Sequence, residues 1–363
     1  MRPRRGMVSP DNAEKKEKIL VSLWPGLGDI MFATPALRAL RHKFPEANIT
    51  AMSLWGKAGR PLLAHNPYVD RLIFMNPREF LSPVRCYAFW KKLRSEKYDL
   101  AVQLSFPIHW LFYLLGIRKR VGFGPGPFWW LVPSREGKDR NTHATDHFIR
   151  AIDRIDGVPY RDGKGYDLKL TRDELGTAQR ILAKWEHTDS PIAVVHPGAR
   201  CNKNKRWGVE KLVALMNKLH RQFSVRFILV GGEDDSHMSQ SIAKQTEAQT
   251  LDLAAKLSLT ETAAVVSKCD LYIGNDTGPT HIVGATGTPI VAIFGSSNPS
   301  AFRPLTDKAI VITPEMECAP CFHPVGHMWL LWGLRLRYYN QCRAMDSISV
   351  DDVFRACENF LAK

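Results

Sequence analysis

The stretch Gly274-Asn-Asp-Thr-Gly-Pro-Thr-His281 lies between apolar runs and decides the predicted fold. Upstream, Asp270 to Gly274 is predicted to form a short buried strand. Downstream, Ile282 to Thr286 has the apolar spacing of a helix, and Pro289 to Phe294 is a further apolar run. The order strand, polar turn, helix, strand is typical of α/β domains, whose ligands bind beyond the carboxyl ends of the strands.

Three residues of this turn suit the start of a helix that binds an anion. Asp276 and Thr277 can cap the helix, and Gly278 lets the backbone approach a ligand closely. The N–H groups that open a helix also favour a phosphate. An ordinary capped turn is the better explanation of an isolated Asp-Thr-Gly. The ligand-binding interpretation therefore depends on companion turns elsewhere in the chain.

The bulk composition predicts two globular domains and an anionic partner. The chain has 363 residues, 45% of them hydrophobic and 24% charged, which is ordinary for a globular protein. The net charge of +14 indicates attraction to nucleic acid, an acidic membrane surface or a phosphorylated substrate. No nucleic-acid module is recognisable, which disfavours the first of these.

Targeting signals are not evident either. We find no apolar core of signal-peptide length after the basic start and no apolar run of about 20 residues. The seven cysteines do not suggest a disulfide scaffold. We therefore expect a cytosolic protein.

Apolar periodicity divides the chain into four parts. Residues 1–18 are predicted to be a disordered basic arm, 19–165 a first α/β domain, 166–345 a second one, and 346–363 a closing helix. The boundary follows the polar, glycine-bearing segment Tyr160 to Gly165. The predicted fold class is α/β, with parallel sheets and helices on both faces.

The segment 106–132 differs in character because the basic block at residues 118–120 stands between two pieces rich in aromatic residues. Its apolar piece is too short to cross a bilayer but could lie in the interface of an anionic membrane. A core helix is the alternative, and we favour it for Leu111 to Leu115. For the tip Phe128-Trp-Trp130 both interpretations remain open.

The turn at Gly274 to His281 is here called the organising turn. Three further turns follow predicted strands. In Gly26-Leu-Gly28-Asp29, the aspartate could cap a helix or serve as a general base over a cleft. In His196-Pro-Gly198, continuing to Lys205-Arg-Trp207, the basic residues suit a pyrophosphate, although a solvated loop explains them as well. Gly231-Gly-Glu233-Asp-Asp235 suits a ribose hydroxyl or a base edge, or is a simple loop.

His281 lies about one helical turn beyond Thr277 and therefore on the same side of the predicted helix. A lone histidine is usually structural. Beside three other strand-end turns, contact with a ligand becomes the better interpretation.

The cysteines near the carboxyl end raise the question of a metal. Cys318, Cys321, His323 and Cys342 could supply the four ligands of a structural zinc ion. The long, hydrophobic and basic spacing before Cys342 disfavours this, and we predict no metal site.

The four motifs together resemble glycosyltransferase family 9, the ADP-heptose:lipopolysaccharide heptosyltransferases. The matching stretches are Gly26 to Leu37, His196 to Gly198, Lys205 to Trp207 and Gly274 to His281, in the family's order and at about its spacing. The resemblance implies a GT-B fold, in which two Rossmann-like domains face each other across a cleft and the last helix crosses back to the first domain. It also implies heptose transfer from ADP-heptose to the inner core of lipopolysaccharide, with inversion and without a bound metal or other cofactor.

The resemblance also implies roles for single residues. Asp29 matches the family's base and Lys205 the lysine on the donor phosphates, so these are the predicted catalytic residues. The predicted donor-binding residues are His196, Gly198, Lys205, Glu233, Asp276, Thr277, Gly278 and His281, with Glu233 or Asp235 in place of a ribose-binding glutamate. The predicted acceptor-binding residues are Gly28, Arg118, Lys119 and Arg120.

The expected partners are a nucleotide-sugar donor and a phosphorylated, lipid-linked saccharide acceptor. The expected location is the cytoplasm, in peripheral contact with the anionic inner face of the cytoplasmic membrane. Three alternatives stay open: a GT-B glycosyltransferase with another donor or acceptor, a nucleotide-sugar epimerase, and a scaffold that binds nucleotide or acidic lipid without turnover.

Overall fold

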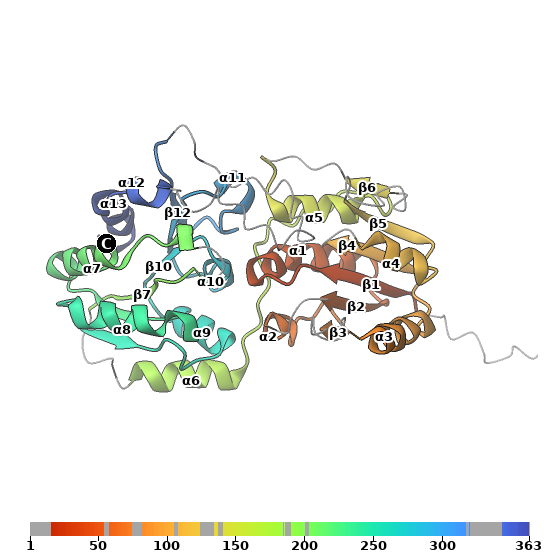
Figure 1. Cartoon of the computed structure of the whole chain (residues 1–363), viewed down its shortest axis with the longest axis horizontal. Coiled ribbons are helices and arrows are strands. Elements are labelled where there is room, and N and C mark those ends of the chain that lie inside the picture. The colour runs from red at the N-terminus through yellow and green to blue at the C-terminus, as the bar shows by residue number, and fades with distance from the viewer. Residues whose placement is uncertain are drawn as a thin grey trace, which may run out of the picture.

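The chain forms two parallel sheets that lie side by side along its long axis (Figure 1). The computed structural model describes residues 16–53, 58–74, 82–104, 108–123, 134–136, 141–183, 185, 190–199, 203–316, 319 and 343–362. Each sheet is covered by helices on both faces, as the alternation of strands and helices along the sequence predicts.

The first sheet has the strand order β3-β2-β1-β4-β5-β6, and every neighbouring pair is parallel. Its strands are β1 (Lys18–Leu23), β2 (Asn48–Ser53), β3 (Arg71–Phe74), β4 (Leu100–Leu104), β5 (Lys119–Phe123) and β6 (Ser134–Glu136). Its helices are α1 (Leu27–Lys43), α2 (Arg60–Leu63), α3 (Pro83–Ser95), α4 (His109–Leu114) and α5 (Ala144–Asp153). The central strands β1 and β4 are buried, which explains their nearly continuous apolar sequences.

The second sheet has the order β12-β11-β10-β7-β8-β9 and is also parallel. Its strands are β7 (Ile192–His196), β8 (Arg226–Leu229), β9 (Thr250–Asp252), β10 (Leu271–Asn275), β11 (Ile290–Ile293) and β12 (Ala309–Ile312). Its helices are α6 (Arg172–Ala183), α7 (Val209–Phe223), α8 (Ser236–Gln245), α9 (Leu259–Val266), α10 (Gly278–Val283), α11 (Pro299–Phe302), α12 (Ala344–Ser347) and α13 (Val350–Leu361), with the 3₁₀ helices η3 (Lys203–Lys205) and η4 (Glu233–Asp235).

Helices α1 and α10 pack against each other where the two domains meet (Figure 1). Each helix follows the carboxyl end of the central strand of its own sheet, β1 and β10. This contact therefore brings the strand-end turn of one domain directly to that of the other.

The connection between the domains is anchored on α1 by Arg38, whose side chain is buried. Its guanidinium donates to a carboxylate oxygen of Asp162 at 2.6 Å and to the Lys164 carbonyl at 3.1 Å, and it pairs with Asp167. The predicted domain boundary at residue 165 falls inside this anchored segment and stays a prediction.

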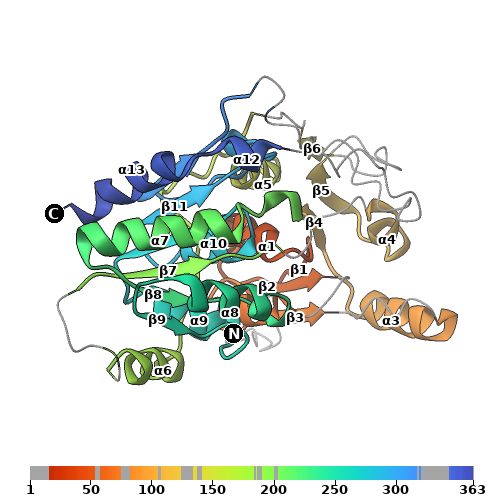
Figure 2. The same cartoon turned by 60° about the vertical axis from the view of Figure 1, so that its left-hand side comes forward.

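The closing helix differs from the prediction. Residues 346–363 were expected to cross back to the first domain, but α13 packs on α7 and beside β11 and β12 (Figure 2). Its buried side chains Val353, Phe354 and Cys357 belong to the core of the second sheet. The apolar face of α13 covers the part of that sheet next to α7, so the helix is used within the second domain.

Among the described residues, none of the helices combines the length and the apolar character needed to span a bilayer. The prediction of a core helix at Leu111 to Leu115 is confirmed for its buried side, since Leu111 and Leu115 lie in the core under α4. The tip at residues 128–130 lies outside the described residues, as does the predicted arm up to residue 15.

Candidate active site

The turn after β1 places Asp29 at the amino end of α1. Gly26 is the N-cap, and the Asp29 carboxylate folds back over it, where a side chain at residue 26 would collide with it. An acidic group in the first turn is stabilised as a carboxylate by the helix dipole. The Asp29 side chain is half-buried, and its turn lies where the two domains meet.

Two glycines let the first turn touch the second. A Cβ atom on Gly28 would lie 2.7 Å from Cδ2 of His281, and one on Gly278 would lie 2.6 Å from Cβ of Leu27. Both distances are shorter than real Cβ contacts, so only glycine fits at either position. The residue next to Asp29 is therefore packed on the organising turn of the second domain.

The organising turn carries a buried carboxylate between two cationic groups. Asp276 is 5% exposed; one of its oxygens lies 2.5 Å from Nζ of Lys205 and the other 3.5 Å from Nε2 of His281. Burial alone would raise the pKa of Asp276, but Lys205 and His281 outweigh it and hold that pKa well below its usual range. The carboxylate thereby fixes the position of Lys205.

A second pair supports the other side of the turn. His196, at the end of β7, lies with Nε2 3.4 Å from Asp235 and with Nδ1 3.4 Å from the hydroxyl of Thr277. Burial by itself raises the pKa of Asp235, and the histidine and the Gly232 N–H reverse this, so that the pKa is lowered. Asp235 thus orients His196 toward Thr277.

The loops around this pair are tightly packed. The amide of Asn275 donates to the carbonyl oxygens of Pro197 at 3.0 Å and Gly198 at 3.2 Å. Gly198 leaves no room for a side chain because a Cβ atom would overlap the Asp235 carboxylate. The loop after β7 is thus fixed on the organising turn.

The structure brings most of the predicted donor residues together but assigns some of them other partners. His196, Gly198, Lys205, Asp276, Thr277, Gly278 and His281 form one cluster. Thr277 is the N-cap residue of α10, as predicted, but its side chain makes no capping hydrogen bond. The side chains of Thr277 and Asp276 instead contact His196 and Lys205.

Two predicted groups are not in this cluster as expected. Glu233 is exposed in η4, and it is the buried Asp235 that reaches His196. Arg118, Lys119 and Arg120 lie where β5 begins, with Lys119 level with Leu100 at the amino end of β4. The Gly26–Asp29 turn lies at the opposite edge, beyond the carboxyl ends of these parallel strands, so the structure does not bring the three basic residues to Gly28.

Sequence reasoning missed residues that link the site to a neighbouring cavity. The Phe32 ring lies 4.6 Å from that of His281 and 5.6 Å from that of His143. His143 lines an open cavity of about 740 Å³ between α5 and α11, together with Arg150 and Arg303. An aromatic one turn after Asp29 was the available signal, but apolar helix residues usually point into the core.

Whether the chain binds a metal ion is a separate question for the predicted ligands and for the rest of the chain. Cys318, Cys321, His323 and Cys342 lie outside the described residues. Within the described part of the chain, no three or more His, Cys, Asp and Glu side chains are grouped so as to hold a metal ion.

Two parallel α/β domains that meet through their strand-end turns form the GT-B fold, which many glycosyltransferases share. The sequence model for glycosyltransferase family 9 (heptosyltransferase) matches residues 86–328. The chain belongs to this family and is a glycosyltransferase.

Known proteins agree with this assignment. Lipopolysaccharide heptosyltransferase 3 of Escherichia coli is 25% identical over 304 residues, which are 78% of this chain and 85% of the relative. The family 9 glycosyltransferase of Veillonella parvula has a similar structure, with a TM-score of 0.81, 23% identity and coverage of 95% of this chain and 97% of that one. For the E. coli ADP-heptose lps heptosyltransferase II, the TM-score is 0.71 and the identity 22%, with 95% and 98% covered.

Proposed function

We propose that this protein transfers a heptosyl group from ADP-heptose to the inner core of lipopolysaccharide, with inversion and without a metal ion. The observation that carries the proposal is the contact between the Gly26–Asp29 turn and the Gly278–His281 turn. It sets a carboxylate of one domain beside a cationic, amide-lined turn of the other. Support for the donor and the acceptor comes from the names of the relatives described above.

The bond changes follow from this arrangement. A hydroxyl oxygen of the acceptor attacks the anomeric carbon of the donor as the bond from that carbon to the diphosphate oxygen breaks. Asp29 takes the proton of the hydroxyl, and ADP leaves with the bonding electrons. Attack from the side opposite the diphosphate inverts the configuration of the anomeric carbon.

Lys205 and the N–H groups at the start of α10 would stabilise the departing diphosphate. An ammonium group has three N–H donors, so Lys205 can hold Asp276 and a phosphate oxygen at the same time. This charge compensation is why we expect no metal on the diphosphate.

The cavity between α5 and α11 suits the acceptor saccharide. Its volume of about 740 Å³ lies in the usual range of small-molecule sites. Arg150 and Arg303 outnumber the one carboxylate in its lining, Asp146, and so favour an anionic sugar. It adjoins the site through His143 and Phe32. This cavity replaces Arg118, Lys119 and Arg120 as the proposed acceptor site.

We also propose that the protein acts at the cytoplasmic face of the inner membrane, where a lipid-linked acceptor would be reached. Membrane contact agrees with the net charge of +14.

The test is a transfer assay with purified protein, ADP-heptose and lipid-linked inner-core acceptors. We expect ADP release that depends on the acceptor, together with a heptosylated product whose new linkage is inverted. Retention of the anomeric configuration, or loss of activity with a chelator and its return with a divalent cation, would contradict the proposed chemistry.

A screen of ADP-, UDP- and GDP-sugars for thermal stabilisation would separate the alternative donors, since a ligand of the native state raises its melting temperature. Interconversion of free nucleotide sugars without an acceptor would indicate the epimerase alternative. Binding without turnover of donor would indicate a scaffold.

A further inference from the structure

Helices α3 and α4 lie side by side on one face of the first sheet. Their inner side chains, including Leu93 and Phe112, share a core with Leu20 and Met52 of the sheet. Nη1 of Arg94 in α3 donates to the carbonyl of Leu114 in α4 at 2.7 Å. The outward sides of the two helices and of the turn to β5 therefore form one surface, here called the α3–α4 face.

This face concentrates exposed apolar side chains. Of the large hydrophobic residues exposed in the described part of the chain, all except Val158 lie on it. They are Val84 (78% exposed), Tyr87 (61%), Tyr113 (57%), Leu114 (48%) and Trp110 (43%). A cluster of this kind on a globular protein marks an interaction site.

The same face is strongly basic. Between Pro83 and Phe123 the sequence has eight lysines and arginines but only two acids, Glu96 and Asp99. The basic residues are Arg85, Lys91, Lys92, Arg94, Lys97, Arg118, Lys119 and Arg120. Lys119 alternates with Arg120 along β5 and lies on the opposite side of the sheet, with Leu100 and Val121, so the α3–α4 face has the other seven. All of them are exposed except Arg120, which is half-buried and lies over the Tyr113 ring.

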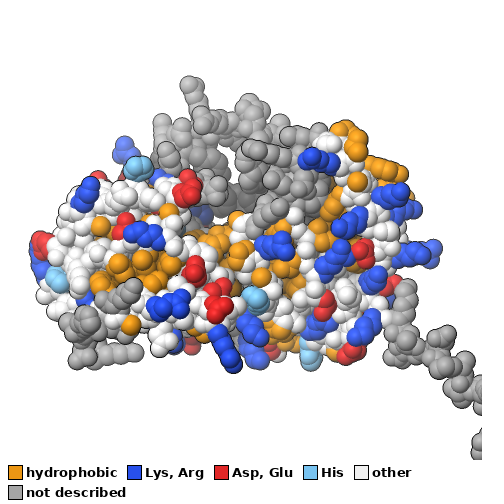
Figure 3. All heavy atoms as spheres, turned by 90° about the horizontal axis from the view of Figure 1, so that it is seen from below, with side chains coloured by type: hydrophobic (Ala, Val, Ile, Leu, Met, Phe, Trp, Pro, Cys, Tyr) orange, Lys and Arg blue, Asp and Glu red, His pale blue; other side chains and the backbone are white. Residues whose placement is uncertain are grey.

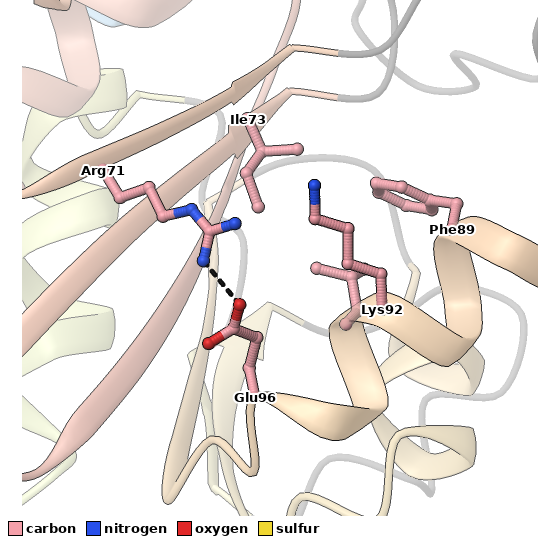
Figure 4. A pocket seen from close by; sticks show the side chains of 6 residues that line it. Arg71, Ile73, Phe89, Lys92 and Glu96 are labelled. Atoms are coloured by element: carbon pink, nitrogen blue, oxygen red, sulfur yellow. Dashed lines mark hydrogen bonds and ion pairs between the residues drawn. The ribbon is translucent and has the colours of Figure 1, made fainter.

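Both acids are turned toward the sheet. Figure 4 shows the Glu96 carboxylate directed at Arg71, with a separation of 2.6 Å. This hydrogen bond is the largest cause of the lowered pKa of Glu96; it outweighs burial, which raises that pKa, and Lys18 lowers it further. Asp99 accepts the backbone N–H of Lys18 at 2.9 Å. The outward charge of the face is therefore positive.

The cavity beneath the face does not resemble a ligand site. It has a volume of about 60 Å³ and is lined by Arg71, Ile73, Phe89, Lys92, Leu93 and Glu96 (Figure 4). This is far below the several hundred Å³ of small-molecule sites. Contact with a partner would therefore be made by the protruding side chains themselves.

The α3–α4 face reaches the edge of the sheet at the carboxyl ends of the strands, where the Gly26–Asp29 turn also lies. Helices α3 and α4 begin after the carboxyl ends of β3 and β4, which are parallel to β1 (Figure 2). Val84, Tyr87 and Trp110 lie in the first turns of these helices, at the edge that also carries Asp29. Figure 3 shows hydrophobic and basic side chains side by side on the first domain, at the right-hand end of that view.

We propose that the α3–α4 face docks on a bilayer that contains anionic lipid and holds the Gly26–Asp29 turn at the lipid surface. Amphipathic aromatic rings enter the interfacial region, and the surrounding lysines and arginines pair with lipid phosphates. The proposal rests on the proposed function in one respect: a lipid-linked acceptor would be presented to the enzyme at the bilayer surface. Docking itself does not require catalysis.

The test is co-sedimentation of the full chain with vesicles, either of phosphatidylcholine alone or of equal parts phosphatidylcholine and phosphatidylglycerol. We expect binding to the anionic vesicles only, weakening with salt. Each basic side chain near such a surface is worth about 1 kcal/mol, so Arg85→Gln with Lys91→Gln should weaken binding about 30-fold. Tyr87→Ser with Tyr113→Ser should weaken it at least tenfold.

Lys256→Gln with Lys268→Gln is the matched control, because it removes the same charge from exposed sites of the second domain. We expect this variant to bind as the unmodified protein does. Equal losses in the control and the Arg85/Lys91 variant, or binding to neither kind of vesicle, would overturn the proposal.

Activity separates this proposal from the proposed function. The two face variants should transfer normally to a short, water-soluble acceptor and slowly to an acceptor embedded in anionic vesicles. Equal rates on both acceptors would overturn docking as a step in the reaction. If the unmodified protein binds the vesicles but transfers to neither acceptor, the proposed function fails and the docking surface stands.

Discussion

Lys205 and Asp276 depend on each other at the scale of single residues. The carboxylate is buried, so it requires the cation, and the cation is held in one position by the carboxylate. Such a preorganised charge is what stabilises a departing diphosphate without reorganisation at the moment of reaction.

Replacing Lys205 with alanine should slow transfer by about 10²–10³-fold, the loss found when one preorganised donor to a developing oxyanion is removed. The effect should fall on kcat as well as on donor use. Steady-state kinetics with the donor varied would measure it, with Lys244→Ala, which changes an exposed lysine in the last turn of α8, as a control expected to transfer normally. An unchanged kcat would exclude Lys205 from the leaving-group site.

The lowered pKa of Asp276 predicts how stability depends on pH. A carboxyl group whose pKa is lower in the folded state stabilises that state above its unfolded pKa of about 4. This contribution is lost as the pH falls from there through the folded pKa. Asp276→Asn should therefore cost about 3 kcal/mol at neutral pH, and less at pH 3.

Urea unfolding at several pH values checks this prediction. The stability of the variant and of the unmodified protein should converge toward acid pH. A constant difference from neutral to acid pH would mean that the charge of Asp276 does not contribute to folding.

At the scale of elements, the contact of α1 with α10 is decided by glycines. Gly28→Ala would place a methyl group 2.7 Å from the His281 ring and so force the two turns apart. We expect transfer to fall at least tenfold, because a displacement of about 1 Å at a site can cost as much as 10²-fold.

Gly176→Ala is the control for this substitution. Residue 176 lies inside α6, where the nearest atom to an added Cβ is on the Arg180 side chain at 3.8 Å. That change should stabilise the protein by about 0.5–1 kcal/mol and leave transfer unchanged. Full activity of Gly28→Ala would show that close approach of the turns is not needed.

Helix α13 belongs to the second domain in this account. Phe354 is buried and stacks near Phe223 of α7, with the ring centroids 6.1 Å apart. Phe354→Ala should cost about 3–5 kcal/mol. Hydrogen exchange should become faster in α7, β11 and β12 while α1 and β1 stay protected; faster exchange in the first domain would contradict the observed packing.

At the scale of the whole molecule, the sequence allowed much of the architecture to be predicted. Buried parallel strands have apolar runs ended by glycine turns, so the strand before the Gly26–Asp29 turn and the organising turn were recognisable. The short strand β9 and the helices α2 and α11 were missed, because three or four residues carry too little periodicity.

The site could be predicted in part. Motif order indicated that Asp29, Lys205 and Asp276 belong together. The sequence does not specify which neighbour each carboxylate meets, so Asp276 was assigned to a helix cap although it pairs with Lys205 and His281. Arg118 to Arg120 were assigned to the acceptor because charge alone does not tell at which edge of a sheet a residue lies.

The most direct test of the central claim is single-turnover transfer by Asp29→Asn, with ADP affinity measured on the same preparation. The substitution preserves shape and removes the base, so we predict that ADP binds as before while the rate of transfer falls about 10²–10⁴-fold. A rate close to that of the unmodified protein would contradict the claim that Asp29 accepts the proton of the acceptor beside the cationic turn of the second domain.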